Sequence, residues 1–258
     1  MFRFFRQLRQ RLLAENRFSK YLLYAVGEIL LVVFGILIAL QVDNWNEQRQ
    51  LRSQEIEVLK SIKKDMGNTI EEFRYLNGIR DQVLYGTKGI FELAATGDYE
   101  KEELDSLLGL TFYRPTFNNK QGAIGLLFSS GKINLIRNDS IRERLQSWPG
   151  MIDDMVEEEA YATEVFLDLY YPAVAKYVVL DEIVELVYST SFFGTKTEEV
   201  RYAALPLEPD YEGLLKDREL LNHLRMRATN MRISNEEITD LILYAQKLIS
   251  MIDAEINT

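Results

Sequence analysis

The chain has 258 residues, 47% of them apolar, and carries 30 basic and 40 acidic residues for a formal net charge of −10 at pH 7. This apolar content predicts one or two folded domains and argues against a disordered chain. The sequence contains no cysteine, which excludes disulfides, thiolate metal sites and cysteine nucleophiles. The acidic balance argues against nucleic acid as a partner, because phosphate binding needs a cationic surface.

Residues 1–20 differ in charge from the rest of the chain. They contain six basic residues and one acidic residue, so their net charge is +5 and the remainder carries −15. Phenylalanine and leucine residues are interspersed among the arginines. This composition predicts a basic amphipathic segment held against the anionic cytoplasmic face of a membrane.

Residues 21–42 form an almost unbroken apolar run. As a helix they would measure about 33 Å, which matches a hydrocarbon core of about 30 Å. The run is longer than the apolar part of a secretory signal, and a buried core helix is the remaining alternative. The positive-inside rule places the N-terminus in the cytoplasm and residues 43–258 in the periplasm. We therefore predict an uncleaved single-pass anchor in a bacterial inner membrane.

One carboxylate, Glu28, lies inside this apolar run. An ionisable side chain at that depth is costly in lipid and is expected to face protein or water. Gly27 and Gly35 lie on nearly one helix face and favour close helix packing. We therefore expect these three residues to contact another membrane helix, in a homo-oligomer or a membrane complex. A proton-coupled role for Glu28 in an auxiliary subunit is the alternative.

Two stretches carry a family resemblance. They are YLLYAVGEILLVVFGILIALQVDNWNEQR at residues 21–49 and SSGKINLIRNDSIRERL at residues 129–145. Both resemble segments of an uncharacterised family, defined as a domain of unknown function, of single-pass membrane proteins in Gram-negative bacteria. The resemblance implies an architecture and a location, and it implies no activity.

Residues 43–258 are expected to form an all-α domain, a helical bundle that continues the membrane helix as a stalk. Apolar residues recur at spacings of three and four in five segments, which are 44–95, 98–110, 115–128, 138–146 and 151–178. Asp98 is expected to cap the second segment. The residues Trp148-Pro149-Gly150 are expected to break the chain between the last two, and Pro172 to kink the last one.

The C-terminal segment has the clearest helical pattern. A near-heptad apolar stripe runs from Leu221 to Ile256, with Asn235 in its one polar slot. A buried Asn at such a position can fix the register of packed helices. Because this segment and residues 44–95 are similar in length, we expect them to pack as an antiparallel pair within the bundle.

Candidate sites for chemistry are few. Asp154 and Glu158 share a helix face and are weak candidates for a hard-cation site, with a solvated face as the alternative. Tyr170, Tyr177 and Phe192 are candidates to line an apolar pocket. The single histidine, His223, is expected to be a packing or surface residue. No catalytic motif and no cofactor motif is found.

The favoured function is therefore that of a non-enzymatic, membrane-anchored structural or interaction protein. Its expected partners are the lipid bilayer and either further copies of itself or other membrane proteins. The alternative is a periplasmic ligand-sensing module that signals through the membrane helix. For that alternative, the sequence leaves any small-molecule ligand open.

Overall fold

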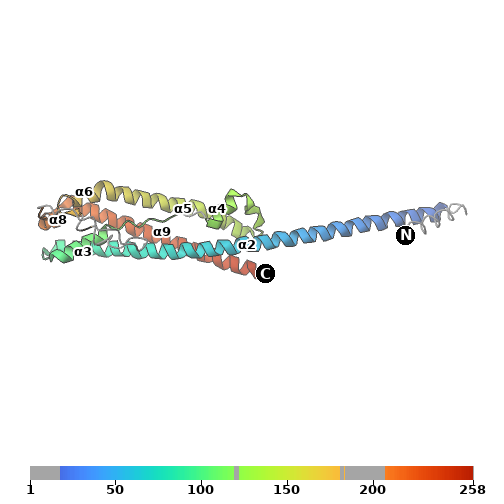
Figure 1. The fold of residues 1–258 in the computed structure, drawn as a ribbon, viewed down its shortest axis with the longest axis horizontal. Helices are drawn as coiled ribbons and strands as arrows, with labels where there is room; N and C mark the ends of the chain where they lie inside the picture. The colour runs from blue at the N-terminus through green and yellow to red at the C-terminus, as the bar shows by residue number, and fades with distance from the viewer. Residues whose placement is uncertain (1–17, 119–121, 181–182, 184–206, 258) are drawn as a thin grey trace, which may run out of the picture. The chain divides into compact units, whose positions relative to one another are not determined.

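The computed structural model describes residues 18–118, 122–180, 183 and 207–257 (Figure 1). Their regular elements are all helical, which confirms the predicted all-α fold. These elements are α2 (Phe18–Thr96), α3 (Lys101–Thr111), α4 (Gly122–Ser129), the 3-10 helix η1 (Lys132–Leu135), α5 (Asp139–Val165), the π-helix η2 (Phe166–Tyr170), α6 (Tyr171–Val174), α8 (Tyr211–Lys216) and α9 (Arg218–Ile256). The chain divides into two compact units, Met1–Glu57 and Val58–Thr258.

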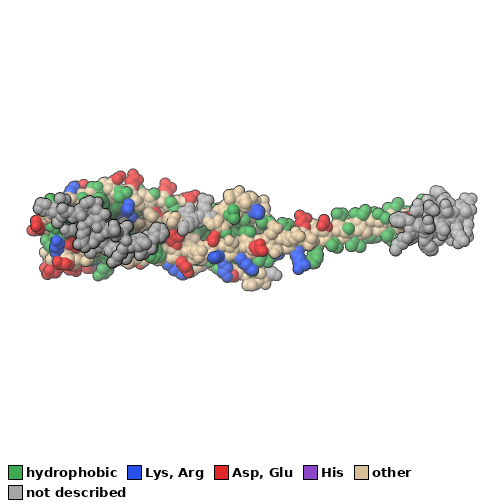
Figure 2. Space-filling model, in the orientation of Figure 1, with side chains coloured by type: hydrophobic (Ala, Val, Ile, Leu, Met, Phe, Trp, Pro, Cys, Tyr) green, Lys and Arg blue, Asp and Glu red, His purple; other side chains and the backbone are tan. Residues whose placement is uncertain are grey.

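In the first unit, the described residues are the first part of α2. This helix is long and apolar enough to cross a membrane. Its large apolar side chains between Val26 and Val42 are 43–73% exposed, and hydrophobic side chains cover the face drawn in Figure 2. None of the apolar window is buried within the protein, so the alternative of a buried core helix is wrong. The predicted basic segment, apart from its last three residues, lies outside the described residues.

The second unit is built on three long helices, α5, α9 and the part of α2 after residue 57, which lie side by side (Figure 1). Lys63 Nζ on α2 lies 2.5 Å from Asp253 Oδ1 on α9, and Asn235 Nδ2 donates to Asp81 Oδ1 over 2.9 Å. Residue numbers therefore rise along α2 as they fall along α9. This register confirms the expected antiparallel pair.

Helix α5 is also antiparallel to α9. Near the start of α5, Tyr244 Oη donates to the Arg144 carbonyl over 2.9 Å. After its end, the guanidinium of Arg227 lies 4.3 Å from the centroid of the Phe166 ring. Helices α2 and α5 therefore run parallel to each other, and α9 runs antiparallel to both.

The buried stripe of α9 is a regular heptad, but it lies one residue away from the predicted one at half of its positions. Its buried residues are Leu220, Leu224, Arg227, Met231, Ser234, Ile238, Leu241, Ala245, Leu248 and Ile252. The polar residues of this stripe are Arg227 and Ser234. The prediction that Asn235 occupies the polar slot is therefore wrong: Asn235 is half-buried and bonds to Asp81. The error arises at adjacent apolar pairs such as Leu241-Ile242, where either residue fits the heptad spacing.

The end of α2 is as expected, whereas the start of α3 is not. Gly97 follows the last residue of α2 with a φ of 72°, a conformation that glycine adopts without strain. Asp98 was expected to cap α3, but the residue before that helix is Glu100, whose side chain makes no capping hydrogen bond. The backbone N–H of Asp98 instead bonds to the Thr96 hydroxyl over 3.3 Å, which places Asp98 in the turn.

Residues 115–128 were expected to form one helix, but residues 113–118 are in no helix or strand, and α4 begins at Gly122. We call residues 113–118 the strap. Backbone N–H groups of the strap donate to carboxylates of α2 and α5 instead of to helical carbonyls, which explains the difference. The other expected break is absent, because α5 continues through Pro149.

Pro149 removes one helical hydrogen bond, at a cost of about 3 kcal/mol. Its neighbours Trp148 and Ile152 are buried in the core, and Trp148 stacks on Tyr244 with 6.0 Å between ring centroids. Burial of such side chains stabilises the helix by amounts of a similar size. At the expected kink, Pro172 lies in the first turn of α6, directly after the π-helix η2. A proline is tolerated there because its N–H is not needed.

Candidate functional site

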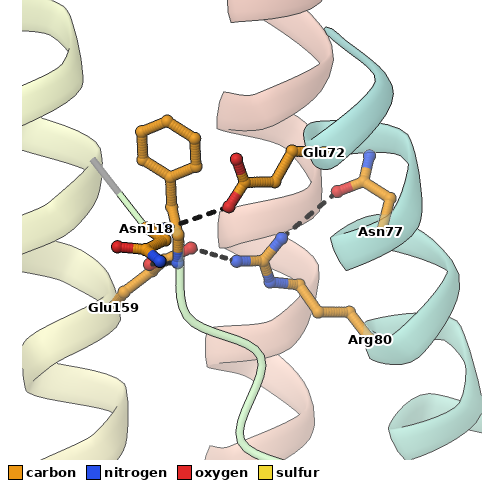
Figure 3. Close-up of polar contacts among 6 residues, drawn as sticks. Glu72, Asn77, Arg80, Asn118 and Glu159 are labelled. Carbon is orange, nitrogen blue, oxygen red and sulfur yellow. Dashed lines mark hydrogen bonds and ion pairs between the residues drawn. The ribbon is translucent and has the colours of Figure 1, made fainter. Parts of the chain in front are cut away.

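A buried ion pair joins two of the three long helices. Arg80 on α2 is fully buried, and Glu159 on α5 is 4% exposed. Arg80 Nη2 donates to Glu159 Oε1, and Arg80 Nη1 donates to Asn77 Oδ1 over 3.3 Å. Figure 3 shows these side chains pointing toward one another from facing helices. Each partner therefore offsets the cost of burying the other's charge.

The same carboxylate also holds the strap. The second oxygen of Glu159 accepts the N–H of Phe117 over 2.7 Å. One residue later, Asn118 N–H donates to Glu72 Oε1 over 3.1 Å (Figure 3). The Phe117 ring packs on Phe73, with 4.9 Å between centroids. Arg80, Glu159 and the Phe117 amide thus form one polar tie that links α2, α5 and the strap.

Burial dominates the electrostatics of this polar tie. Burial raises the pKa of Glu159, while the Phe117 amide and Arg80 act in the opposite direction. Burial lowers the pKa of Arg80, and Glu159 opposes that shift. Pairing therefore offsets part of the burial cost of each charge in the core. Among the described residues, the space beside Arg80 and Glu159 measures about 10 Å³, which is about the volume that one water molecule needs.

Arg227 on α9 is a second buried arginine, and it bonds to backbone carbonyls. It is 2% exposed, its Nε donates to the Thr111 carbonyl over 2.7 Å, and its Nη2 donates to the Tyr113 carbonyl. The guanidinium also covers the Phe166 ring. Arg227 therefore satisfies the carbonyls at the C-terminal end of α3, which lack helical partners.

The residues predicted to line an apolar pocket lie in different surroundings. Tyr170 is fully buried, and its hydroxyl is 2.7 Å from that of Thr111. Burial raises its pKa to about 12. Tyr177 instead donates to Asp217 Oδ2 over 2.6 Å, and this hydrogen bond raises the pKa of Tyr177. Phe192 lies outside the described residues, so a pocket formed by all three stays a prediction.

The weak metal candidates, Asp154 and Glu158, are both exposed on α5. Among the described residues, no three carboxylate or histidine side chains converge to hold a metal ion. Burial raises the pKa of Glu237 on α9, and the charge of Glu158 raises it further. His223 is 18% exposed, and its Nε2 lies 3.6 Å from Glu219 Oε1, one turn earlier.

The predicted contact residues of the membrane helix lie on α2. Gly27 and Gly35 are exposed, and a Cβ added to either would meet no atom of the protein within 4 Å. Glu28 is half-buried. The glycines therefore leave a shallow surface on which a second helix can approach closely.

A cavity of about 340 Å³ lies in the second unit. Its walls come from α2, α4 and α5, and they consist of Asp65, Met66, Thr69, Gly122, Ile124, Gly125, Phe128, Ser129, Trp148, Pro149, Ile152 and Asp153. This volume is at the lower end of the range for small-molecule sites. The cavity is separate from the polar tie and from the predicted pocket residues.

Sequence reasoning missed the polar tie, Arg227 and the cavity. A signal exists for the first two. Arg80 stands between Leu76 and Val83 at spacings of four and three, and Arg227 stands between Leu224 and Met231 at spacings of three and four. A charged residue at a core position of a heptad pattern indicates a buried, paired charge. The cavity has no such signal, because its walls come from three segments far apart in sequence.

Comparison with known proteins gives one family. Residues 28–148 match a family described as "Family of unknown function (DUF6090)". The matched range is just under half of the chain; it includes most of the apolar run and the strap, and it ends before Glu159. No curated protein and no solved structure matches the chain. The similarity therefore supplies no activity.

Proposed function

We propose that this protein is a single-pass membrane protein whose helical bundle acts as a structural or interaction module, without catalysis. The observation that carries the proposal is the bare apolar segment of α2, whose large side chains from Ile29 to Val42 are at least 43% exposed. Exposed apolar area of this extent is unfavourable in water and favourable in lipid. Trp45 follows the apolar segment, with the Arg49 guanidinium 5.8 Å from its ring centroid, as suits a membrane interface.

The second unit supports an interaction role. Its described core consists largely of apolar side chains, and the buried charges of Arg80 and Glu159 pair with each other. The proposed location is the inner membrane of a Gram-negative bacterium, with the basic N-terminal segment in the cytoplasm and the bundle in the periplasm. The charge asymmetry around the apolar run supports this orientation.

Single-cysteine labelling tests the orientation, because the natural chain has no cysteine. In intact cells with a permeabilised outer membrane, a membrane-impermeant maleimide is expected to label Ser147→Cys, which is on an exposed position of α5. Asn16→Cys is expected to be labelled only after lysis. The cysteine-free protein is the control for background labelling. Labelling of Asn16→Cys but not Ser147→Cys in intact cells would reverse the proposed orientation.

We further propose that α2 associates with a second copy of itself through Gly27, Glu28 and Gly35. Gly35→Leu is expected to weaken self-association in detergent by about tenfold, since packing between membrane helices depends on close backbone approach. Sedimentation of the full chain in detergent measures the effect. Val33→Phe adds bulk on the opposite side of the same helix and is the matched control. Equal association of Gly35→Leu and the natural protein would exclude this interface.

Glu28→Gln separates the two roles considered for the carboxylate. Glutamine keeps the capacity to hydrogen-bond between helices but cannot exchange a proton. The interhelical role predicts unchanged self-association for this variant. A pH-dependent association that Glu28→Gln abolishes would instead favour the proton-coupled alternative.

The ligand-sensing alternative has one observation in its favour, which is the cavity between α2, α4 and α5.

A further inference from the structure

We propose that this cavity binds a small amphipathic organic cation, with an ammonium group at its rim and an apolar body between the helices. The inference goes beyond the proposed function, because an anchored interaction protein needs no ligand. It rests on the size of the cavity, the apolar walls and the chemistry of the polar rim.

The walls are largely apolar and aromatic. Trp148 and Ile152 of α5 are 7% and 3% exposed, Met66 of α2 is 1% exposed, and Phe128 of α4 is half-buried. With about 340 Å³ available, the cavity accommodates a body of the size of one aromatic ring and a short chain. The faces of aromatic rings also attract cations.

The charged residues among the described walls of the cavity have one sign. They are Asp65 on α2 and Asp153 on α5, and none of the wall residues that the structure describes is lysine or arginine. Oδ2 of Asp65 accepts the N–H of Ala123 at the start of α4. Within the described part of the chain, neither carboxylate has an ion-pair partner, and Oδ1 of Asp65 accepts no hydrogen bond. Two carboxylates without an ion-pair partner among the described residues therefore favour a cationic occupant.

The remaining polar groups of the rim present acceptors. The Thr69 hydroxyl donates to the Asp65 carbonyl over 3.0 Å, and the Ser129 hydroxyl donates to the Leu126 carbonyl over 3.2 Å. With their protons used within their own helices, these oxygens offer lone pairs to the cavity. Pro149 has no N–H to donate. An occupant that satisfies this rim must itself be a hydrogen-bond donor.

A bare metal ion does not fit these walls. A divalent cation such as Ca²⁺ takes about six to eight oxygen ligands, whereas this cavity offers two carboxylates beside a broad apolar surface. An organic ammonium ion uses both parts, because its charge meets the carboxylates and its body covers the apolar walls. The two parts together define the class of ligand.

The chain contains its own reporter for a test, since it has two tryptophans and Trp148 lines the cavity. Trp45→Phe leaves Trp148 as the only tryptophan. Full-length Trp45→Phe in detergent is titrated with phenethylammonium, phenethyl alcohol and hydrocinnamate, which share one body and differ in the head group. We expect a saturable change in tryptophan fluorescence with phenethylammonium, at least tenfold weaker binding of the alcohol, and no saturation with the anion.

Charge-neutral variants in the same background locate the site. Asp153→Asn and Asp65→Asn are each expected to weaken phenethylammonium binding about tenfold, by loss of one ion contact. Asparagine at 65 keeps an acceptor for the Ala123 amide, and Asp153 is exposed, so both variants retain the fold. Asp154→Asn removes the same charge one residue outside the cavity and is the matched control.

Three results would overturn the proposal. They are absence of saturation with all three compounds, equal binding of the ammonium and the alcohol, or equal weakening by Asp154→Asn and Asp153→Asn. None of these results bears on cysteine labelling or on self-association. The proposed membrane function and the ligand site therefore stand or fall separately.

Discussion

Arg80→Met is expected to lower the free energy of unfolding by about 3–5 kcal/mol at neutral pH, because it leaves the buried carboxylate of Glu159 without its countercharge. The loss is measured by denaturant unfolding of the full chain in detergent, followed by circular dichroism. Lys63→Met is the matched control, since it removes one partner of a pair between α2 and α9 whose side chains are 43% and 45% exposed. Such exposed pairs contribute about 0–1 kcal/mol.

The loss in Arg80→Met is expected to depend on pH. Burial already raises the pKa of Glu159, and removal of Arg80 takes away a group that lowers it. An acid whose pKa is raised in the folded state binds more protons folded than unfolded, so stability falls as pH rises through that range. The deficit should therefore be small below the ordinary pKa of a glutamate and should grow as pH rises through the raised pKa of Glu159.

The double variant Arg80→Met/Glu159→Gln completes the test. Glutamine is neutral and keeps an acceptor for the Phe117 amide, so the double variant is expected to recover most of the stability lost in Arg80→Met at neutral pH. Its stability should also lose the pH dependence described for the single variant. A pH-independent loss in Arg80→Met, no larger than that in Lys63→Met, would show that the ion pair is not buried in solution.

Substitution by alanine at two glycines of α2 is expected to change the free energy of unfolding in opposite directions. A Cβ at Gly86 would lie 2.6 Å from the Leu107 carbonyl oxygen and 2.9 Å from Leu110 Cβ. Because the nearest atom belongs to the backbone of α3, that helix must move, and Gly86→Ala is expected to cost about 1–3 kcal/mol. A Cβ at Gly78 meets nothing within 4 Å, so Gly78→Ala should stabilise the helix by about 0.5–1 kcal/mol.

Unfolding of the two glycine variants under identical conditions measures the difference. The pair is well matched, since both changes are the same substitution in the same helix and differ only in what lies opposite. Stabilisation by both would mean that α3 does not pack against α2 at Gly86.

The parts of this fold that follow from sequence are those set by long, uninterrupted patterns. An almost unbroken apolar run of 22 residues identifies a segment able to cross a membrane. Near-heptad spacing identifies α9, and its similar length to residues 44–95 identifies its antiparallel partner. Local signals were less reliable. Pro149 did not end α5, because burial of Trp148 outweighs one lost hydrogen bond. The strap is not helical, because its amides bond to Glu72 and Glu159 in other helices.

The candidate site was less predictable than the fold. Arg80 was detectable in principle as a charge at a core position. Its partner Glu159 is one of five acidic residues between positions 153 and 159, and nothing in the sequence marks it as the buried one. Asp65 and Asp153 are 88 positions apart. Only the packing of three helices shows that they line the same cavity.

The contact between Lys63 and Asp253 joins residues separated by 190 positions. Ribosomal synthesis proceeds from the N-terminus, so the apolar stripe of α2 emerges long before the α9 residues that cover it. A contact of such high sequence separation is slow to form, and the chain exposes hydrophobic surface until it has formed. During biogenesis the nascent bundle therefore depends on protection of its first helix until the last one has been made.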